Sequence, residues 1–170
     1  RTTEGLLAIS VALHDLGKLN LKWQKSIGIR EEWLPLAHIA YQQKVPPHAT
    51  ISADAVYPVF KTLLPNIYFA LAFKFAIAHH HHTRAKEITP YELGWRSQYE
   101  GIIKEVCREY SIDVDPAEIR TSEKAYKKLE TRMFNLEALK PYTAYCIISR
   151  TLRLSDRESF IMNNGNLFKS

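Results

Sequence analysis

Apolar residues recur along most of this chain with the period of an α-helix, and no run keeps the two-residue alternation of a strand. The clearest example covers residues 3–18, where apolar side chains fill most of the circumference, so this helix is expected to be central and buried. The same pattern predicts helices over residues 30–43, 50–64, 67 to the histidine run at 79, 89–110, 122–134 and 141–160. It predicts a short turn over residues 21–27 and a loop over residues 111–116.

Prolines mark the boundaries of several of these helices. The pair Pro46 and Pro47 ends the second helix, and Pro65 with Asn66 separates the next two. The dipeptide Thr89–Pro90 is a helix start signal, because Thr is a good N-cap and Pro suits the first turn. No internal repeat or low-complexity segment appears. We therefore predict an all-α fold, a single-domain helical bundle that covers residues 1–170.

Composition and charge exclude few functions. A chain of 170 residues with 46% hydrophobic content is expected to fold around one core, and a net charge of +5 favours polyanionic partners only mildly. The longest apolar stretch, Ile67–Ala78, contains Lys74 and is too short to span a bilayer, so no membrane association is expected. We expect Cys107 and Cys146 to be buried free thiols in a reducing, cytoplasmic compartment, and a disulfide between them has no support. Nothing indicates an oligomer, so a monomer is expected.

Histidine and aspartate residues carry the candidate chemistry. Six of the seven histidines fall in three places, at His14, at His48 and at His79–His82. His14 and Asp15 follow an apolar run, and burying such a pair is unfavourable unless a partner, usually a metal ion, compensates it. Neighbouring side chains on a helix diverge by about 100°, so one residue could bind one ion while the other reaches a second. Lys18, on the same helical face as His14, could place its positive charge beside a bound phosphate. The alternative is an ordinary polar helix end at the surface.

The other histidines are also candidate ligands. Two prolines precede His48 and would hold a ligand at a helix start, although a capping or loop histidine is the alternative. The run His79–His82 follows a buried apolar helix, and no structural role explains four histidines there. Consecutive residues at a helix end fan around the axis, so at most two of the four can face one centre. We expect the other two to be surface residues or residues that support the ligands.

A distant aspartate completes the set. Asp156 lies on a mostly apolar helix, where an interior carboxylate needs a cation or several hydrogen-bond donors. A salt bridge to Arg153 or Arg157 is the alternative. For Asp54 and His38, which lie on amphipathic helices, we expect solvated or hydrogen-bonded roles rather than metal ligation.

Taken in order, these segments resemble the motifs of a known family, the HD superfamily of metal-dependent phosphohydrolases. Within that superfamily, the best match is the HD nuclease domain of the CRISPR-associated Cas3 proteins. The segment HDLGKLNLKWQ is similar to the HD motif of that group, HATISA to its His-x-x-x-Ser motif, AIAHH to its double-His motif and LRLSDRESF to its terminal Asp motif. These motifs span Leu13 to Phe160, and their order and spacing together are specific, whereas each motif alone is weak.

The resemblance implies a central cleft with one or two divalent transition-metal ions, drawn from Mn, Ni, Co, Fe and Zn, with Mg as a further candidate. It implies that Asp15 can bridge two ions. For the double-His pair, alignment favours His80 and His81, with His79 and His80 as the alternative. The implied metal ligands are His14, Asp15, His48, His80, His81 and Asp156.

The resemblance also implies a function. We expect a metal-dependent nuclease that hydrolyses phosphodiester bonds of single-stranded DNA in CRISPR interference, beside a helicase domain or subunit and a CRISPR surveillance complex. In the mechanism that we expect, two ions about 3.5–4 Å apart hold the scissile phosphate and activate a water. Asp15 and Lys18 are the catalytic candidates, and Lys18 would offset the negative charge that grows on the phosphorane.

One departure from the family pattern is visible. The family usually has a further metal-binding His upstream of the HD pair, and none of the 13 residues before His14 is a His. We expect a fragment without that upstream helix, a permuted order as in the related Cas10 proteins, or a weakened first metal site. Two other functions stay open: an HD-type nucleotide phosphohydrolase, and a degenerate HD module that docks to a CRISPR effector complex.

Overall fold

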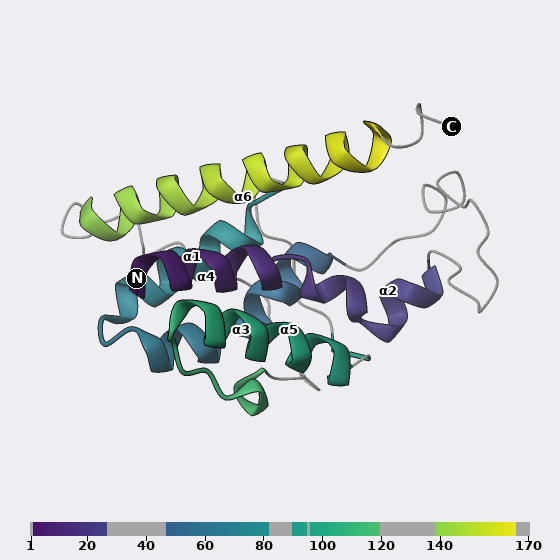
Figure 1. Ribbon diagram of the computed structural model, residues 1–170, viewed down its shortest axis with the longest axis horizontal. Helices are drawn as coiled ribbons and strands as arrows, with labels where there is room; N and C mark the ends of the chain where they lie inside the picture. Colours follow the sequence, from purple (N-terminus) through teal and green to yellow (C-terminus); the bar gives the residue numbers. More distant parts are fainter. Residues whose placement is uncertain (1, 27–46, 82–89, 95, 120–138, 166–170) are drawn as a thin grey trace.

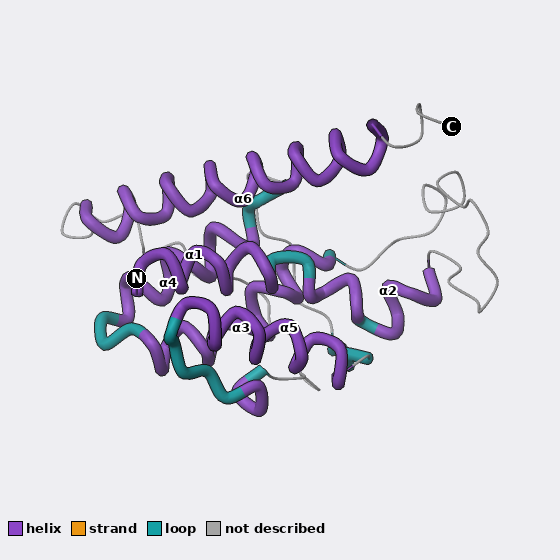
Figure 2. The backbone as a smooth tube through the Cα atoms, in the orientation of Figure 1, coloured by secondary structure: helices purple, strands orange, loops and turns teal. Residues whose placement is uncertain are grey.

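The helical periodicity of the sequence appears as helices in the structure, a computed structural model that describes residues 2–26, 47–81, 90–94, 96–119 and 139–165 (Figure 1). The α-helices are α1 (Thr2–Leu13), α2 (Leu21–Ser26), α3 (His48–Leu63), α4 (Ile67–Ala78), α5 (Arg96–Tyr110) and α6 (Leu139–Gly165). The described residues also contain two 3₁₀ helices, η1 (Leu16–Leu19) and η2 (Pro116–Glu118). The described residues contain no strand, so the prediction of an all-α fold is confirmed (Figure 2).

Helix α4 lies between α3 and α6, because it is apolar around its whole circumference. Small residues at Ala70, Ala72 and Ala76 are completely buried and let the neighbouring helices approach closely. The rings of Phe60 on α3 and Phe73 on α4 stack with centroids 4.6 Å apart. This contact fixes α3 against α4, and each of these helices has a candidate metal ligand at or next to one end.

Helix α6 extends along one side of the bundle and contacts both α4 and α1 (Figure 1). Its inner face buries Ile148 and Leu152, whereas Ile147 and Leu154 lie on the exposed side. Because α6 packs across both helices, it brings Asp156 toward the ends of α1 and α4. None of the helices in the described ranges is long and apolar enough to cross a membrane.

The helix predicted over residues 3–18 is correct as far as Leu13 and wrong beyond it. Helix α1 ends at Leu13, a turn holds His14 and Asp15, and η1 follows. In a continuing helix, the Gly17 N–H would donate to the carbonyl four residues earlier. Here it donates instead to Ser52 Oγ, 35 positions later in the sequence, and the helix does not continue. The idea that His14 and Lys18 share a helical face is therefore wrong as well, since no continuous helix joins them.

Two further boundaries differ from the prediction. Residues 21–26 form the short helix α2 rather than a turn. Helix α5 begins at Arg96 and not near Pro90, because residues 90–94 are extended and pair with the chain before α2. There Leu21 N–H donates to the carbonyl of Glu92, and Gly94 N–H donates to the carbonyl of Leu19. Those bonds take backbone groups that a helix would have used.

The other helical predictions fare better. Helices α3 and α4 agree with prediction to within two residues, and α6 extends the predicted 141–160 helix at both ends. Residues 111–115 lie outside any helix or strand, as predicted, and Ser111 has a positive φ of 53°. The helices predicted over residues 30–43 and 122–134, together with Thr89, His38 and His82, lie outside the described residues.

The two cysteines differ in how far they are exposed to solvent. Both cysteines are free thiols, but Cys146 is exposed and Cys107 is only half-buried, so the prediction that both are buried is wrong. Burial raises the pKa of the Cys107 thiol.

Asp54 is buried and accepts a hydrogen bond of 2.9 Å from Tyr91 Oη, with Lys74 Nζ 3.6 Å from its other oxygen. The expected hydrogen-bonded role of Asp54 is confirmed.

Candidate metal centre

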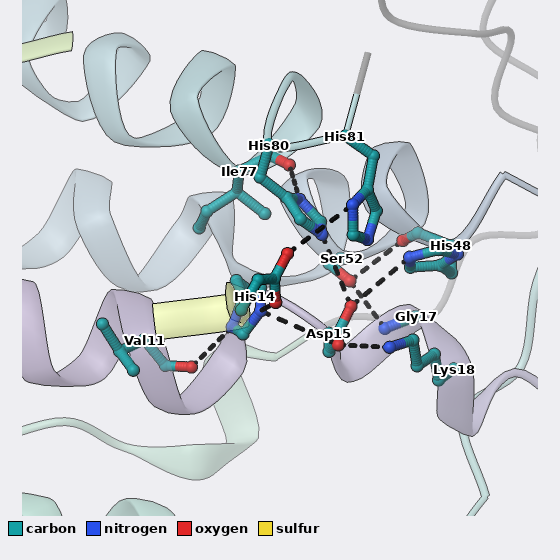
Figure 3. A network of polar contacts seen from close by, with 11 residues as sticks. Val11, His14, Asp15, Gly17, Lys18, His48, Ser52, Ile77, His80 and His81 are labelled. Carbon is teal, nitrogen blue, oxygen red and sulfur yellow. Dashed lines mark hydrogen bonds and ion pairs between the residues drawn. The ribbon is translucent and has the colours of Figure 1, made fainter. Parts of the chain in front are cut away.

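Six side chains from four parts of the chain meet at one end of the bundle, and we call them the His/Asp cluster. They come from the turn after α1, from the first residue of α3, from the two positions that follow the α4 cap residue, and from α6. Figure 3 shows five of them labelled, with Lys18 beside them. The cluster consists of His14, Asp15, His48, His80, His81 and Asp156.

The turn that carries Asp15 is fixed against the start of α3. Gly17 N–H donates to Ser52 Oγ at 2.7 Å, and that hydroxyl donates to the carbonyl of His48 at 2.9 Å. A Cβ atom at Gly17 would lie 2.1 Å from the carbonyl oxygen of His48, so only glycine allows this approach. The pair Gly17 and Ser52 therefore places Asp15 opposite His48.

A backbone hydrogen bond fixes the tautomer of His14. Its Nδ1 lies 2.6 Å from the carbonyl oxygen of Val11, and because a carbonyl only accepts, Nδ1 must carry the proton. In a neutral ring, Nε2 then has a lone pair. That atom lies 2.8 Å from Oδ1 of Asp156, which is also an acceptor. Two acceptors at this distance need a cation between them, either a proton on Nε2 or a metal ion.

His80 repeats the same arrangement. Its Nδ1 lies 2.6 Å from the carbonyl oxygen of Ile77, three residues upstream, so Nδ1–H donates there as well. Its Nε2 lies 3.4 Å from Oδ1 of Asp15. The His80 side chain is completely buried, so water cannot compensate the two facing acceptors from that side.

Three buried polar atoms converge without a hydrogen bond. His48 Nε2 lies 3.3 Å from the same oxygen of Asp15 that His80 approaches. Asp15 Oδ1, His48 Nε2 and His80 Nε2 are all buried, and none of them has a hydrogen-bond partner among the described residues. Orphaned buried acceptors are rare in proteins, and imidazole nitrogen with carboxylate oxygen is a donor set that suits first-row transition metals.

The ligand atoms form two overlapping groups. In one, Asp15, His48, His80 and His81 offer atoms that all lie within 4.8 Å of one another, and in the other, His14, His80 and Asp156 do so. Two such groups that share a histidine can hold one or two ions. The expected metal ligands are thus brought together, and the chemistry of the donor set fits a divalent transition metal.

Asp15 is held as a carboxylate. Burial is the largest single influence on the pKa of Asp15, and it raises that pKa. The approach of His48, His80 and Lys18, together with the charge of His14, lowers the pKa, and these effects combined outweigh burial. The net result is a pKa well below the ordinary range of an aspartate. An ionised aspartate within a group of histidines is the form that binds a metal ion.

His81 favours the neutral form. Burial, followed by the charges of His80 and His48, lowers its pKa to about 4, although Asp156 and Asp15 oppose this shift. Its Nδ1 lies 3.5 Å from Oδ2 of Asp156, and about a third of its side chain is exposed. A histidine that stays neutral near pH 7 keeps a nitrogen lone pair for a metal ion.

His79, by contrast, faces away from the cluster. Its Nδ1 lies 3.1 Å from Tyr145 Oη on α6, and its carbonyl oxygen accepts a 3.4 Å hydrogen bond from Arg153 Nη2. Burial lowers its pKa, and the charge of Arg153 acts in the same direction. His79 therefore joins the end of α4 to α6, whereas His80 and His81 point into the cluster.

Lys18 lies at the rim of the cluster. Its ammonium group forms an ion pair with Oδ2 of Asp15, and 40% of its side chain is exposed. Trp23 on α2 packs edge-on against His48, with ring centroids 5.9 Å apart.

The sequence alone did not identify the backbone carbonyls of Val11 and Ile77, which fix the tautomers of His14 and His80. Any residue type supplies a backbone carbonyl, so no sequence pattern points to these two.

Comparison with models of known protein families, with curated proteins and with solved structures found no match. The chemical character of the cluster therefore rests on the facing acceptors described above, and the chain is one whose described residues can hold a metal ion.

Proposed function

We propose that this chain is a metal-dependent phosphodiesterase of the HD type that cleaves single-stranded DNA. The observation that carries the proposal is the convergence of Asp15 Oδ1, His48 Nε2 and His80 Nε2, three buried polar atoms with no hydrogen-bond partner among the described residues. A structural role leaves such atoms uncompensated, whereas a divalent cation compensates all three at once. The order of the HD, His-x-x-x-Ser, double-His and Asp motifs supports the same assignment.

In this proposal, the residues of the cluster and Lys18 have different roles. His14 and His80 present fixed lone pairs, because each donates its Nδ1–H to a backbone carbonyl. Asp15 offers both of its oxygens, one toward His48 and His80 and the other toward His14 and Lys18. When bound, divalent ions supply an activated water nucleophile and stabilise charge on the phosphoryl oxygens. The Lys18 ammonium offsets the charge that grows on the phosphate in the transition state.

Partial exposure of the cluster supports a polymeric substrate. The side chains of His48, Asp15 and Asp156 are between 21% and 29% exposed, so the cluster opens to solvent at its rim. A net charge of +5 favours a polyanion in the same direction. A site for a single nucleotide needs a closed pocket with groups that read the base, which these exposures do not favour. The helicase and the CRISPR surveillance complex belong to the proposal through the motif resemblance alone.

The experiment is cleavage of a circular single-stranded DNA, which has no ends and so reports endonuclease activity. The protein is purified without a histidine tag and assayed in Mn²⁺, Ni²⁺, Co²⁺ and Mg²⁺, beside parallel reactions with deoxynucleoside triphosphates and cyclic nucleotides. The test variant is Asp15→Asn, which keeps the shape of the side chain and removes its charge. The matched control is Asp113→Asn, the same change at an exposed position in the loop after α5.

The proposal predicts that wild-type protein and Asp113→Asn linearise and degrade the circle in at least one transition metal, while Asp15→Asn is inactive. Hydrolysis of nucleotides without DNA cleavage would replace the proposal with a nucleotide phosphohydrolase. Equal rates for wild-type protein and Asp15→Asn would contradict the proposed mechanism. A folded protein with no bound metal and no activity would favour a docking module.

A further inference from the structure

The two carboxylate oxygens of Asp15 lie in different surroundings. Oδ1 is buried and faces His48 Nε2 at 3.3 Å and His80 Nε2 at 3.4 Å. Oδ2 forms the ion pair with the Lys18 ammonium and lies 3.7 Å from His14 Nε2 (Figure 3). Oδ1 therefore has only imidazole nitrogens near it, whereas Oδ2 already pairs with the ammonium group of Lys18.

The backbone holds Lys18 next to Asp15. Lys18 N–H donates to the Asp15 carbonyl at 2.9 Å in the 3₁₀ turn, so the two side chains start from adjacent positions. The ammonium itself is not enclosed, since 40% of the Lys18 side chain is exposed. A partly exposed ion pair is weak, and a lysine can move its charged end into water while its methylene stem stays in place.

The different surroundings of its two oxygens affect how Asp15 could bridge two metal ions. An ion on the Oδ1 side, with His48 and His80, meets no lysine or arginine side chain of the described residues at that oxygen. An ion that uses Oδ2, with His14, must share the oxygen with the Lys18 ammonium or displace it. Two cations on one oxygen repel each other, and the ammonium is the one that is free to leave for solvent.

We infer that Lys18 acts as an internal competitor for the second metal ion and so sets the order of loading. The Oδ1 side of Asp15 fills first, and the Oδ2 side fills only when the ammonium swings out. The inference rests on the proposed function, because it needs the cluster to bind metal. It adds that the two sites differ in affinity because of one residue that is not a ligand.

The experiment measures Mn²⁺ binding directly and does not depend on catalysis. Free Mn²⁺ is followed by its electron paramagnetic resonance signal during titration of wild-type protein, Lys18→Met, Lys18→Arg and Lys22→Met. Lys18→Met keeps the length of the side chain and removes the charge, whereas Lys18→Arg keeps the charge. Lys22→Met is the matched control, because it removes the same charge four residues away, where Nζ is exposed and contacts only the Pro90 carbonyl at 3.4 Å among the contacts described.

Lys18→Met is expected to bind the second equivalent of Mn²⁺ about fivefold more tightly than wild-type protein, with the first equivalent unchanged. Lys18→Arg and Lys22→Met are expected to behave like wild-type protein. Circular dichroism and the melting temperature of each variant in a chelator show whether it is folded.

Three outcomes would overturn the inference. Identical isotherms for Lys18→Met and wild-type protein would show that Lys18 does not compete, while metal binding itself, and with it the proposed function, would stand. Equal tightening in Lys22→Met would show an effect of net charge. No Mn²⁺ binding by any folded variant would overturn the inference and the proposed function together.

Discussion

His14 and Asp156 are 142 positions apart in the sequence, and in the structure His14 Nε2 lies 2.8 Å from Asp156 Oδ1. The other ring nitrogen of His14 is already committed to the Val11 carbonyl. The contact therefore joins the turn after α1 to α6 only when a cation, either a proton or a metal ion, lies at Nε2. This links the packing of α6 to the state of the cluster, and it makes the loading of the cluster visible in stability as well as in activity.

His79 and His80 are neighbours in the sequence, but only His80 is expected to bind a metal ion, whereas His79 packs against α6. Replacing His80 by Gln is expected to lower the affinity for Co²⁺ by at least about 100-fold, since even loss of a supporting contact costs 10- to 100-fold. Replacing His79 by Gln removes the contacts of its ring with Tyr145 and Phe75, neither of which belongs to the cluster, and should leave the affinity unchanged. Titration followed by the visible absorption of bound Co²⁺ measures both. Equal affinities for the two variants would show that His80 is not a ligand.

Gly17 is expected to tolerate no side chain. Gly17→Ala places a Cβ atom 2.1 Å from the His48 carbonyl oxygen, so the free energy of unfolding should fall by about 1–3 kcal/mol and metal affinity should fall with it. The control is Gly101→Ala on α5, where a Cβ atom meets nothing within 4 Å. That variant should be more stable by about 0.5–1 kcal/mol, because alanine favours a helix. Urea unfolding in a chelator compares them, and a neutral Gly17→Ala would contradict the described turn.

The lowered pKa of His81 predicts a dependence of stability on pH. Its pKa in the folded protein is about 4, below the ordinary value of 6.5, so the unfolded chain takes up a proton between these values and the folded chain does not. Stability should therefore fall as the pH drops from 7 to 5. His81→Gln should reduce this fall by about 1 kcal/mol, because a third of the side chain is exposed and solvent screens the effect.

Urea unfolding at pH 7 and pH 5 in a chelator makes this measurement. Asp15 does not interfere, because its lowered pKa affects stability only at more acidic pH. The same fall in wild-type protein and in His81→Gln would mean that His81 does not stay neutral in the fold.

The positions of most helices and the members of the cluster could be predicted from the sequence, and the reasons are local. Helix α4 is apolar all round, and prolines separate α3 from its neighbours, so both elements follow from the chain itself. The end of α1 at Leu13 could not be predicted, because it depends on the hydrogen bond from Gly17 to Ser52. That bond forms only when α3 is in place.

The choice among the four histidines could be narrowed but not settled from spacing. Helix α4 ends at Ala78, and His79 then turns toward Tyr145 on α6. The next two residues consequently face Asp15 and Asp156. The partner that decides this, Tyr145, lies 66 positions later in the sequence, where no periodicity connects it with His79.

A buried ion pair outside the cluster offers an independent test of the fold. Asp54 is 2% exposed and lies 3.6 Å from Lys74 Nζ, which also lies over the ring of Tyr57 at 4.4 Å. Asp54→Ala leaves the lysine without this carboxylate and should lower the free energy of unfolding by about 3–5 kcal/mol. The double variant with Lys74→Met should recover part of that loss. Metal affinity should stay unchanged in the folded fraction, and a loss of affinity would show that the two sites are coupled.

The central claim is that the His/Asp cluster is a metal centre, and the most direct measurement is the metal content of the protein. Wild-type protein, Asp15→Asn and Asp113→Asn are purified without a histidine tag or added metal and analysed for every first-row transition metal. We predict one or two equivalents per chain in wild-type protein and in Asp113→Asn, with Asp15→Asn nearly free of metal. Folded wild-type protein that holds no transition metal and takes up none on titration, or Asp15→Asn with the full content, would contradict the account.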